Sequence, residues 1–278
     1  MTDALPSLQD VIAHFGLRAK KNFGQHFLLD QTVTDRIVQK AGVSANMDVI
    51  EIGPGPGGLT RALLASPAKR ITVVEKDERC LPVMQQLRDV AEGRLNILMG
   101  DALEVNLAEH TDAPRAIIAN LPYNVGTQMV LQWLQQWYDD AEAFAHVTVM
   151  LQQEVVERLM AQPKSKSYGR LSVLCQWLCH ASQLMHLPPE AFTPPPKVDS
   201  GVVQLSLRKR DDKVPFALME KLLQTAFNQR RKMLRKALQP LGVDVLALCA
   251  AAGIAETKRP DEISVADYVR LAEAYAAL

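Results

Sequence analysis

Short apolar runs alternate with segments of helical periodicity between residues 48 and 152 of this 278-residue chain. The runs that we predict to be strands cover residues 49–52, 71–75, 95–99, 116–119 and 147–151. Helices are predicted between them at residues 59–65, 80–90 and 127–137. Alternation of this kind gives an α/β fold with a mostly parallel sheet that helices cover on both faces. Functional sites in such sheets lie at the carboxyl ends of the strands.

The pattern changes toward the end of the chain. Helices predicted at residues 154–160 and 171–178 precede a strand at residues 202–207, whose alternation suits an antiparallel addition at the sheet edge. Beyond residue 210 only helices are expected, at residues 216–238, 243–252 and 265–277. We therefore predict two domains, an α/β domain over residues 1–208 and a small all-helical domain over residues 209–278.

Composition excludes several classes of protein. Lys and Arg together number 31, as do Asp and Glu, so the net formal charge is zero and a polyanionic partner would need a local basic patch. The four cysteines form no C-x-x-C pair, so buried thiols are expected rather than a metal site. Residues 1–15 lack the features of a targeting signal, and no segment approaches the ~20 apolar residues of a membrane span. A cytoplasmic protein without metal or membrane partner is expected.

A tetrad of unusual chemistry, Asn120-Leu121-Pro122-Tyr123, directly follows the apolar run at residues 116–119. The Asn120 side-chain oxygen and the Leu121 carbonyl can each accept one N–H of an amino group on a planar base, and the Tyr123 ring can stack on that base. This chemistry fits N-methylation of adenine if a methyl donor lies beside it. The simpler alternative is a proline-containing turn that ends a strand.

A glycine-rich turn at residues 51–60 links the first predicted strand to a helix. Its Gly53 and Gly55 let the backbone approach a ligand, but the spacing also satisfies the dinucleotide fingerprint G-x-G-x-x-G. Glu75 ends the second strand, where it could accept hydrogen bonds from ribose hydroxyls, and Asp101 follows the third, where it could accept from an adenine amino group. Together with Asn120 after the fourth strand, these acids favour S-adenosylmethionine over NAD. We therefore expect a Rossmann-like class I S-adenosylmethionine methyltransferase.

Seven motifs appear in order along the chain and carry a resemblance to a known family. They occupy residues 21–28, 51–60, 120–124, 151–155, 167–172, 192–200 and 226–232. From about residue 18 to 275 the sequence resembles the bacterial small-subunit ribosomal RNA adenine dimethyltransferases, the KsgA family. The resemblance implies transfer of two methyl groups to N6 of each of two adjacent adenines near the 3′ end of 16S rRNA. It also implies that the substrate is the assembling 30S particle, and a monomeric enzyme is expected.

The resemblance also assigns residues to the methyl donor. Those that it places there are His26, Leu28, Gly53, Glu75, Asp101 and Asn120. His26 occupies a position that is often Asn in relatives, and since both side chains donate a hydrogen bond we expect the substitution to be tolerated.

An adenine must leave its stack to reach such a pocket, and a flipped base is usually held between aromatic or apolar faces. We predict that Tyr123 covers one face and Phe192, between two proline clusters, covers the other. The alternative for Phe192 is packing into the junction between the domains. With Asn120 and Leu121, these two aromatic residues complete the predicted catalytic set.

RNA binding is predicted for three sets of basic residues. On a helical wheel of residues 216–238, four basic side chains share the face opposite the apolar one: Arg231, Lys232, Arg235 and Lys236. Arg18, Lys20 and Lys21 form a basic N-terminal arm, and Lys164, Lys166 and Arg170 are further phosphate candidates. Arg230 falls on the apolar side, so we expect it to be partly buried and paired. A solvated face without RNA is the alternative for the four-residue stripe.

Three competing functions remain open on the sequence alone. An antibiotic-resistance (Erm) type enzyme, which methylates adenine in 23S rRNA, shares the cofactor turn and an Asn-x-Pro-Tyr tetrad, although residues 168–170 and 227–232 argue against it. A non-catalytic nucleic-acid factor on the same fold, as among mitochondrial transcription factors, would not need the tetrad and the acids. An NAD-dependent dehydrogenase would leave residues 120–123 unexplained.

Overall fold

The computed structural model describes residues 5–17 and 25–278. Its Cα positions group into two compact units. The sheet unit comprises Met1–Val156 and Ser182–Ser206, and the helical unit comprises Glu157–Ala181 and Leu207–Leu278. The chain passes from the sheet unit to the helical unit for the last time between Ser206 and Leu207, two residues before the predicted boundary. The structure also groups residues 157–181 with the C-terminal helices, which was not predicted. The assignment of one domain to the cofactor and the other to RNA stays a prediction.

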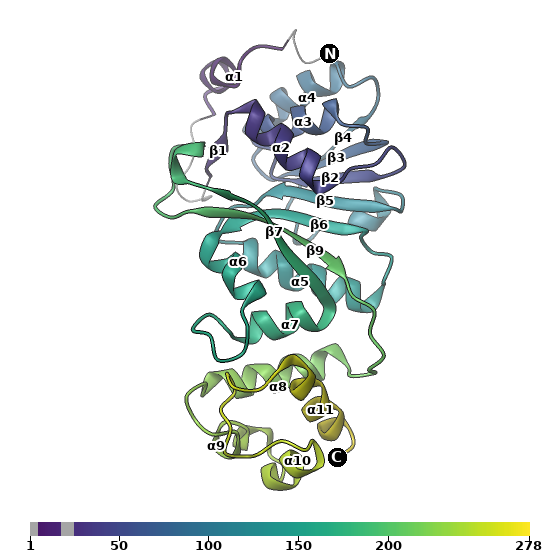
Figure 1. Cartoon of the computed structure of the whole chain (residues 1–278). Coiled ribbons are helices and arrows are strands. Elements are labelled where there is room, and N and C mark those ends of the chain that lie inside the picture. The colour runs from purple at the N-terminus through teal and green to yellow at the C-terminus, as the bar shows by residue number, and fades with distance from the viewer. Residues whose placement is uncertain (1–4, 18–24) are drawn as a thin grey trace. The chain divides into compact units, whose positions relative to one another are not determined.

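A seven-stranded sheet forms the centre of the sheet unit (Figure 1), in the order β4-β3-β2-β5-β6-β9-β7. Its strands are β2 (Asp48–Ile52), β3 (Arg70–Glu75), β4 (Leu95–Met99), β5 (Arg115–Asn120), β6 (His146–Gln152), β7 (Cys179–Leu187) and β9 (Ser200–Leu207). The first five in this order pair in parallel, and β9 pairs antiparallel with β6. The predicted α/β fold with a mostly parallel sheet is therefore confirmed, and each predicted strand lies within two residues of its observed bounds.

Helices flank both faces of this sheet. The helices of the sheet unit are α1 (Leu8–His14), α2 (Gln31–Ala41), α3 (Gly58–Ala65), α4 (Leu81–Asp89) and α5 (Gly126–Asp139), with short 3-10 turns η3 (Glu78–Cys80), η4 (Leu107–Glu109) and η5 (Pro189–Ala191). Helix α6 (Gln153–Met160) begins in this unit and ends in the helical unit. Figure 1 shows α2, α3 and α4 on one side of the sheet and α5 on the other. Asp30 caps α2 by accepting from the Thr32 N–H, and Gly42 ends it in the left-handed conformation.

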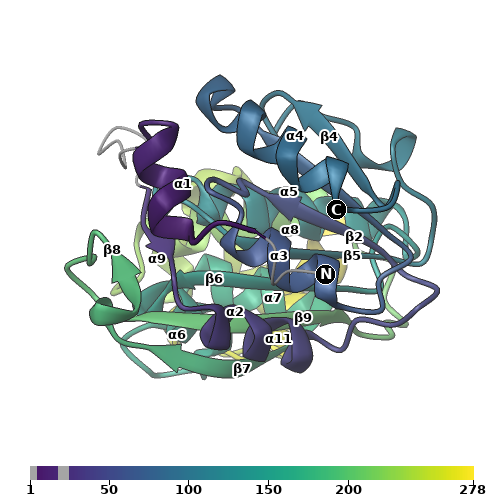
Figure 2. The ribbon, with the colours of Figure 1, turned by 90° about the horizontal axis from the view of Figure 1, so that it is seen from above.

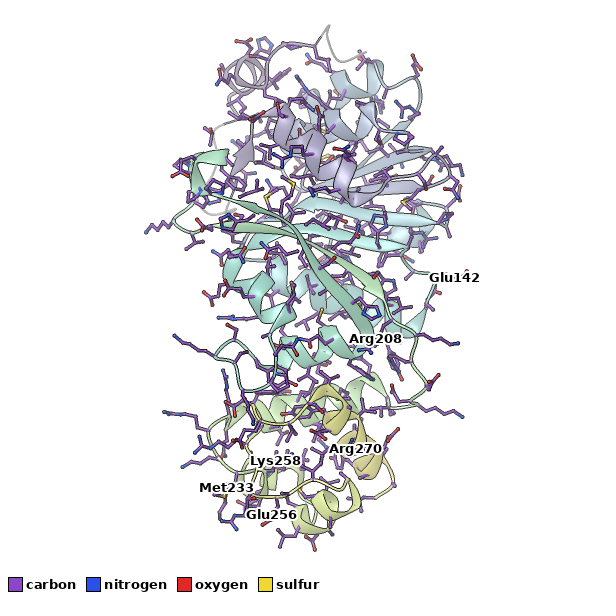
Figure 3. All side chains as sticks on the ribbon, viewed as in Figure 1. Glu142, Arg208, Met233, Glu256, Lys258 and Arg270 are labelled. Carbon is purple, nitrogen blue, oxygen red and sulfur yellow. The ribbon has the colours of Figure 1, made fainter. Side chains whose placement is uncertain are left out.

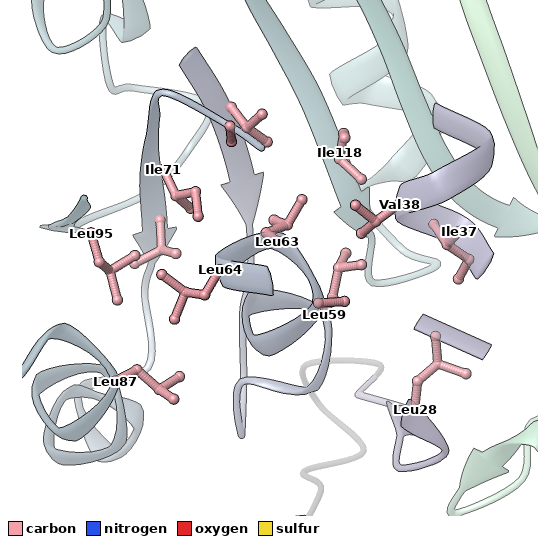
Figure 4. Packing of buried hydrophobic residues seen from close by; sticks show 14 of the residues in the cluster. Leu28, Ile37, Val38, Leu59, Leu63, Leu64, Ile71, Leu87, Leu95 and Ile118 are labelled. Carbon is pink, nitrogen blue, oxygen red and sulfur yellow. The ribbon is translucent and has the colours of Figure 1, made fainter. Parts of the chain in front are cut away.

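The core follows the two-residue period of the strands. Val49, Ile71 and Ile118 belong to one buried cluster with residues of α2, α3 and α4, as Figure 4 shows for Leu63, Val38 and their neighbours. The intervening Ile50 and Ile117, also buried, point to the opposite face. Both faces of the sheet are therefore buried, which explains why the strands are continuous apolar runs in the sequence.

A second, two-stranded sheet joins the N-terminal segment to a distant loop. In it β1 (Phe27–Leu28) pairs antiparallel with β8 (Phe192–Thr193), so that Leu28 lies opposite Phe192; β8 is labelled in Figure 2. Strands of two residues carry no periodicity, and neither was predicted. Their pairing matters for function, because it brings residues 25–28 to the ends of the main strands.

The helical unit contains α7 (Arg170–Leu178), α8 (Phe216–Asn228), α9 (Leu234–Ala237), α10 (Val245–Ala251) and α11 (Val265–Ala276), with a 3-10 turn η6 (Gln239–Leu241). Tyr168 and Tyr268 are fully buried in it. Their hydroxyls donate to the carbonyls of Ile263 and Pro260, at 3.1 and 2.7 Å. Both phenols therefore satisfy their polar end inside an apolar core.

The prediction of a single helix over residues 216–238 is wrong. Helix α8 ends at Asn228, and Met233 is extended before α9 begins. The N–H groups of Leu234 and Arg235 donate to the carbonyls of Lys258 and Glu256 rather than to the preceding turn, at 2.7 and 3.0 Å. Figure 3 shows Met233, Glu256 and Lys258 at the same end of the helical unit. Tertiary hydrogen bonds thus replace the helical ones, and the predicted basic stripe does not lie on one helix.

All four cysteines are buried and free of disulfide bonds. Cys175 lies in α7, and Cys179 begins β7. In residues 5–17 and 25–278, no three His, Cys, Asp or Glu side chains gather as a metal would require. Within those residues, none of the helices has the length and apolar character to cross a membrane.

Candidate active site

A cavity of about 230 Å³ opens at the carboxyl ends of β2, β3, β4 and β5. Nine residues predicted for the cofactor or for catalysis line it: His26, Leu28, Gly53, Gly55, Glu75, Asp101, Asn120, Leu121 and Tyr123. All belong to the sheet unit. Residues far apart in the chain meet here because parallel strands end at the same edge, which is where α/β sheets place their ligands.

The glycine-rich turn owes its shape to two close approaches. Gly55 adopts φ +55° and donates its N–H to Glu75 Oε2 at 3.1 Å. A Cβ on Gly58, the first residue of α3, would lie 2.6 Å from the Leu28 carbonyl oxygen. Glycine at these positions therefore lets the turn bend into the cavity and lets β1 pack directly on the start of α3.

Both carboxylate oxygens of Glu75 are held by backbone groups. Oε2 accepts from Gly55 N–H and Oε1 accepts from Asp77 N–H at 2.8 Å. Burial raises the pKa of this carboxyl, and these hydrogen bonds oppose that rise. Each oxygen keeps a further lone pair for a ligand hydroxyl. The carboxylate is therefore fixed in position at the end of β3, as binding of a ribose diol requires.

A second carboxylate, Glu51 at the end of β2, also lines the cavity. It is 2% exposed, and its Oε2 accepts from Thr60 Oγ1 at 2.7 Å. Burial, together with the nearby Glu75 charge, raises its pKa to about 8. No role was predicted for Glu51, although an acid inside a buried apolar strand is a signal that could have singled it out.

Asp101, after β4, is bound on one side by a lysine. Lys76 Nζ lies 2.7 Å from Asp101 Oδ2, and the Leu103 N–H donates to Oδ1 at 3.0 Å. The Lys76 side chain holds the pKa of Asp101 below its usual range. Asp101 is therefore an ionised acceptor at the edge of the cavity, as hydrogen bonding to an adenine amino group requires.

Asn120 is oriented by the backbone of the N-terminal segment. Its Nδ2 donates to the His26 carbonyl at 3.0 Å. Because the nitrogen is engaged there, Oδ1 is the side-chain atom left to accept a hydrogen bond from a ligand. The β1–β8 pairing, which positions His26, thus determines that the oxygen of the Asn120 amide, and not its nitrogen, is left to bind a ligand.

Tyr123 is fixed at both its ring and its hydroxyl. The His26 ring stacks on it, with centroids 5.3 Å apart and planes 29° from parallel. The Tyr123 hydroxyl lies 2.5 Å from Ser200 Oγ, and burial raises its pKa. His26 is itself held, since its Nδ1 donates to the Pro194 carbonyl at 2.8 Å. His26 thus contributes a ring to Tyr123 and a carbonyl to Asn120.

Phe192 lies elsewhere than the sequence suggested. Its side chain is 3% exposed, belongs to the core cluster and is absent from the lining of this cavity. Its ring meets His26 edge-on, with centroids 6.5 Å apart. The Phe192 ring could contact a base only if it left the core. In the observed arrangement the ring packs against His26 instead.

The predicted RNA-binding residues form three groups, of which Lys164, Lys166 and Arg170 lie before and at the start of α7, with both lysines exposed and Arg170 half-buried. Arg18, Lys20 and Lys21 lie outside the residues that the structure describes. Arg231, Lys232, Arg235 and Lys236 are exposed on the helical unit, on the turn after α8 and on α9, and Arg235 Nη1 lies 3.9 Å from Glu256 Oε1. Arg230 is partly buried and paired with Asp261 at 3.2 Å, as expected.

The fold and the site together are those of a class I S-adenosylmethionine-dependent methyltransferase. Solved structures support this fold. A dimethyladenosine transferase from Plasmodium falciparum matches with a TM-score of 0.75 at 22% identity, over 91% of this chain and 98% of its own. The 23S rRNA methyltransferase ErmE matches with a TM-score of 0.64 at 24% identity, over 89% of this chain and 98% of its own. At these identities the likeness concerns the fold alone.

Sequence comparison identifies the family. The model of the ribosomal RNA adenine dimethylase family matches residues 16–277. The Ribosomal RNA small subunit methyltransferase A of Roseobacter denitrificans is 48% identical over 99% of this chain and 98% of its own length. The enzyme of the same name from Azorhizobium caulinodans is 47% identical over 98% of this chain and 94% of its own. The chain therefore belongs to the ribosomal RNA adenine dimethylase family, and the expected S-adenosylmethionine-dependent rRNA adenine dimethyltransferase is confirmed.

Proposed function

We propose that this protein dimethylates N6 of two adjacent adenines near the 3′ end of 16S rRNA in the maturing 30S subunit. The observation that carries the proposal is the orientation of Asn120, whose Nδ2 is engaged by the His26 carbonyl so that its oxygen is left for the cavity. The names of the 47–48% identical relatives support the small subunit as the target. We propose that it acts in the cytoplasm, because its substrate would be an assembling ribosomal particle, and that it acts as a monomer.

The described residues fit S-adenosylmethionine. Glu75 would accept from the ribose hydroxyls, because two backbone N–H groups already fix its carboxylate. Asp101 would accept from the adenine amino group, and Gly53, Gly55, His26 and Leu28 would border the remainder of the donor. When bound, the donor supplies an electrophilic methyl group on a sulfonium.

The tetrad would prepare the nucleophile. The lone pair of adenine N6 is delocalised into the ring, which makes this nitrogen a poor nucleophile. If Asn120 Oδ1 and the Leu121 carbonyl each accept one N6 hydrogen, the nitrogen is drawn toward tetrahedral geometry with its lone pair directed at the methyl. The rate gain would come from positioning and local electrostatics. The nitrogen is cationic after transfer, so water can take its proton and no strong base is needed.

The second methylation uses the same acceptors. A monomethylated N6 retains one hydrogen, so one of the two acceptors suffices once the product has rotated in the pocket. Both acceptors are held in place, Asn120 by the His26 carbonyl and the Leu121 carbonyl by the backbone of a buried residue. One site can therefore carry out both transfers on each adenine.

Tyr123 would hold the flipped adenine by stacking. The Tyr123→Ala variant is expected to lower kcat/KM for 30S particles about 10- to 100-fold, since stacking on an aromatic side chain is worth ~1–3 kcal/mol per base. Tyr123→Phe keeps the ring and loses only the contact with Ser200 Oγ, so we expect its effect to stay below about 10-fold. Steady-state methyl transfer measures both variants, and equal losses in the two would contradict a stacking role.

The exposed cations of the helical unit would contact rRNA phosphates. Because Arg235 lies near Glu256, it is left in place, and Arg231, Lys232 and Lys236 are changed together to Glu. We expect it to weaken 30S binding and to reduce the slope of log K against log salt by about 2–3. The matched control reverses Lys209 and Lys213, which lie on the loop before α8. A slope unchanged from wild type would place the RNA surface elsewhere.

One experiment tests the proposal as a whole. The protein is incubated with unmethylated 30S subunits, or with free 23S rRNA, and labelled S-adenosylmethionine, and the modified nucleotides are mapped by mass spectrometry. The proposal predicts dimethyladenosine at two adjacent positions near the 3′ end of 16S rRNA. Methylation of 23S rRNA instead would support the Erm-type alternative, and the absence of any methylation would support a non-catalytic factor.

A further inference from the structure

Glu51 is a buried carboxylate in the wall of the cofactor cavity with one oxygen left over. Its side chain is 2% exposed, and Oε2 accepts from Thr60 Oγ1 at 2.7 Å. Among residues 5–17 and 25–278, Thr60 is the one hydrogen-bond partner that Glu51 has. Glu51 also lines the cavity, so a ligand bound there lies close to this carboxyl.

The charged groups around Glu51 do not neutralise it. On β3, Glu75 adds a second negative charge. On α3, Arg61 turns away and donates to the Pro6 carbonyl at 2.8 Å. Beyond β3, Asp77 is paired with Arg79, and on β5 Asn120, which also lines the cavity, is uncharged. In this setting the carboxyl takes up a proton, and its pKa rises to about 8.

The ligand changes this balance. S-adenosylmethionine carries a sulfonium, an ammonium and a carboxylate and has a net charge of +1, whereas the product S-adenosylhomocysteine lacks the sulfonium and is neutral overall. A positive charge within several ångströms favours the ionised form of a buried carboxyl. We propose that Glu51 is a charge switch that holds a proton in the empty site, releases it to solvent when the cationic donor binds, and takes it back when the neutral product remains.

The switch gives the site a means to distinguish donor from product. The ionised Glu51 attracts the donor, and its reprotonation after transfer removes that attraction, which favours product release. Because proton binding and ligand binding are linked, the affinity for the donor must rise with pH until Glu51 is ionised in the empty site as well. The inference rests on the proposed cofactor but not on the RNA target.

Calorimetric titration measures the released proton directly. The protein is titrated with S-adenosylmethionine at pH 7 in buffers of different ionisation enthalpy, and the slope of the observed enthalpy gives the proton number. A carboxyl with a pKa of about 8 is protonated in roughly nine of ten empty molecules at pH 7, so we expect wild type to release up to about 0.9 proton more than Glu51→Gln. The donor's own ammonium also exchanges protons on binding, so the proton number is compared between the two proteins rather than interpreted alone.

Two further titrations serve as controls for the proton number assigned to Glu51. Wild type titrated with S-adenosylhomocysteine should release fewer protons than with S-adenosylmethionine, an arm that needs no variant. Glu78→Gln, an exposed acid on η3, should behave as wild type. Equal proton numbers for the two ligands, or for wild type and Glu51→Gln, would overturn the charge switch. Absence of donor binding would overturn the proposed cofactor too, whereas binding without proton release would overturn only this inference.

The stability of the ligand-free protein provides an independent measurement. The pKa of Glu51 is raised from 4.5 to about 8 in the folded state, so its stabilising contribution is present below pH 4.5 and is lost as pH rises through 8. Gln has no such dependence. The Tm of Glu51→Gln relative to wild type should therefore increase from pH 5 to pH 8 and level off near pH 9. A constant difference over this range would contradict the proposal.

Discussion

Replacing Asn120 with alanine is expected to lower methyl transfer about 1000-fold or more while leaving the fold intact. Removal of a preorganised hydrogen-bonding group in an active site costs about 10²–10³ in rate, and here the acceptor also shapes the nucleophile itself. Because Asn120 is half-buried at the end of β5, its truncation removes little of the core. Single-turnover methylation of 30S particles with saturating donor measures the loss.

The Asn120→Asp variant separates acceptor chemistry from orientation. A carboxylate still accepts hydrogen bonds, but it cannot donate to the His26 carbonyl, which Asn120 Nδ2 contacts at 3.0 Å. Its charge would instead repel that carbonyl and turn the side chain away. We therefore expect Asn120→Asp to lose more than about 10-fold in rate. Asn46→Ala, on an exposed turn before β2, is the control variant and should match wild type in rate. Near-normal turnover of Asn120→Ala would contradict the proposed role of Asn120.

Glu75→Gln is expected to impair donor binding almost as severely as Glu75→Ala, by about 100-fold or more in Kd. Both carboxylate oxygens accept backbone N–H groups, from Gly55 and Asp77. An amide has a single oxygen, so its NH₂ group would face one of these donors and leave it unsatisfied at a cost of about 1–3 kcal/mol. The loss of two charge-assisted hydrogen bonds to the ribose adds to this.

The measurement for Glu75 is titration with S-adenosylmethionine in the absence of RNA. Glu78→Gln, which is close in the chain but exposed, serves as the matched control and should retain wild-type affinity. If Glu75→Gln bound the donor as well as wild type, the ribose would have to contact another group. Circular dichroism of each variant establishes that the sheet is intact.

The sequence predicted the parallel strands well because burial on both faces makes them continuous apolar runs. It failed where tertiary contacts decide the conformation. The strands β1 and β8 are too short to show a period, and β7 alternates buried and exposed residues irregularly at the sheet edge. The break after α8 depends on backbone donation from Leu234 to Lys258, which no local pattern encodes.

The candidate site was largely predictable for the same reason that it forms. Polar residues at the ends of buried parallel strands must meet at one edge of the sheet, so it could be predicted from spacing alone that Glu75, Asp101 and Asn120 lie together. The orientation of Asn120 could not, because it depends on the carbonyl of His26 94 residues away. Phe192 was misplaced since the sequence shows an aromatic residue among prolines but not which way its ring points.

A crystal structure of the protein with S-adenosylhomocysteine tests the central claim most directly, because that claim concerns the position of the donor relative to Asn120. The account predicts both ribose hydroxyls within hydrogen-bond distance of Glu75, the adenine amino group at Asp101, and the sulfur on the side of the cavity that Asn120 Oδ1 faces. A ligand bound outside this cavity, or one whose sulfur points away from the end of β5, would contradict it.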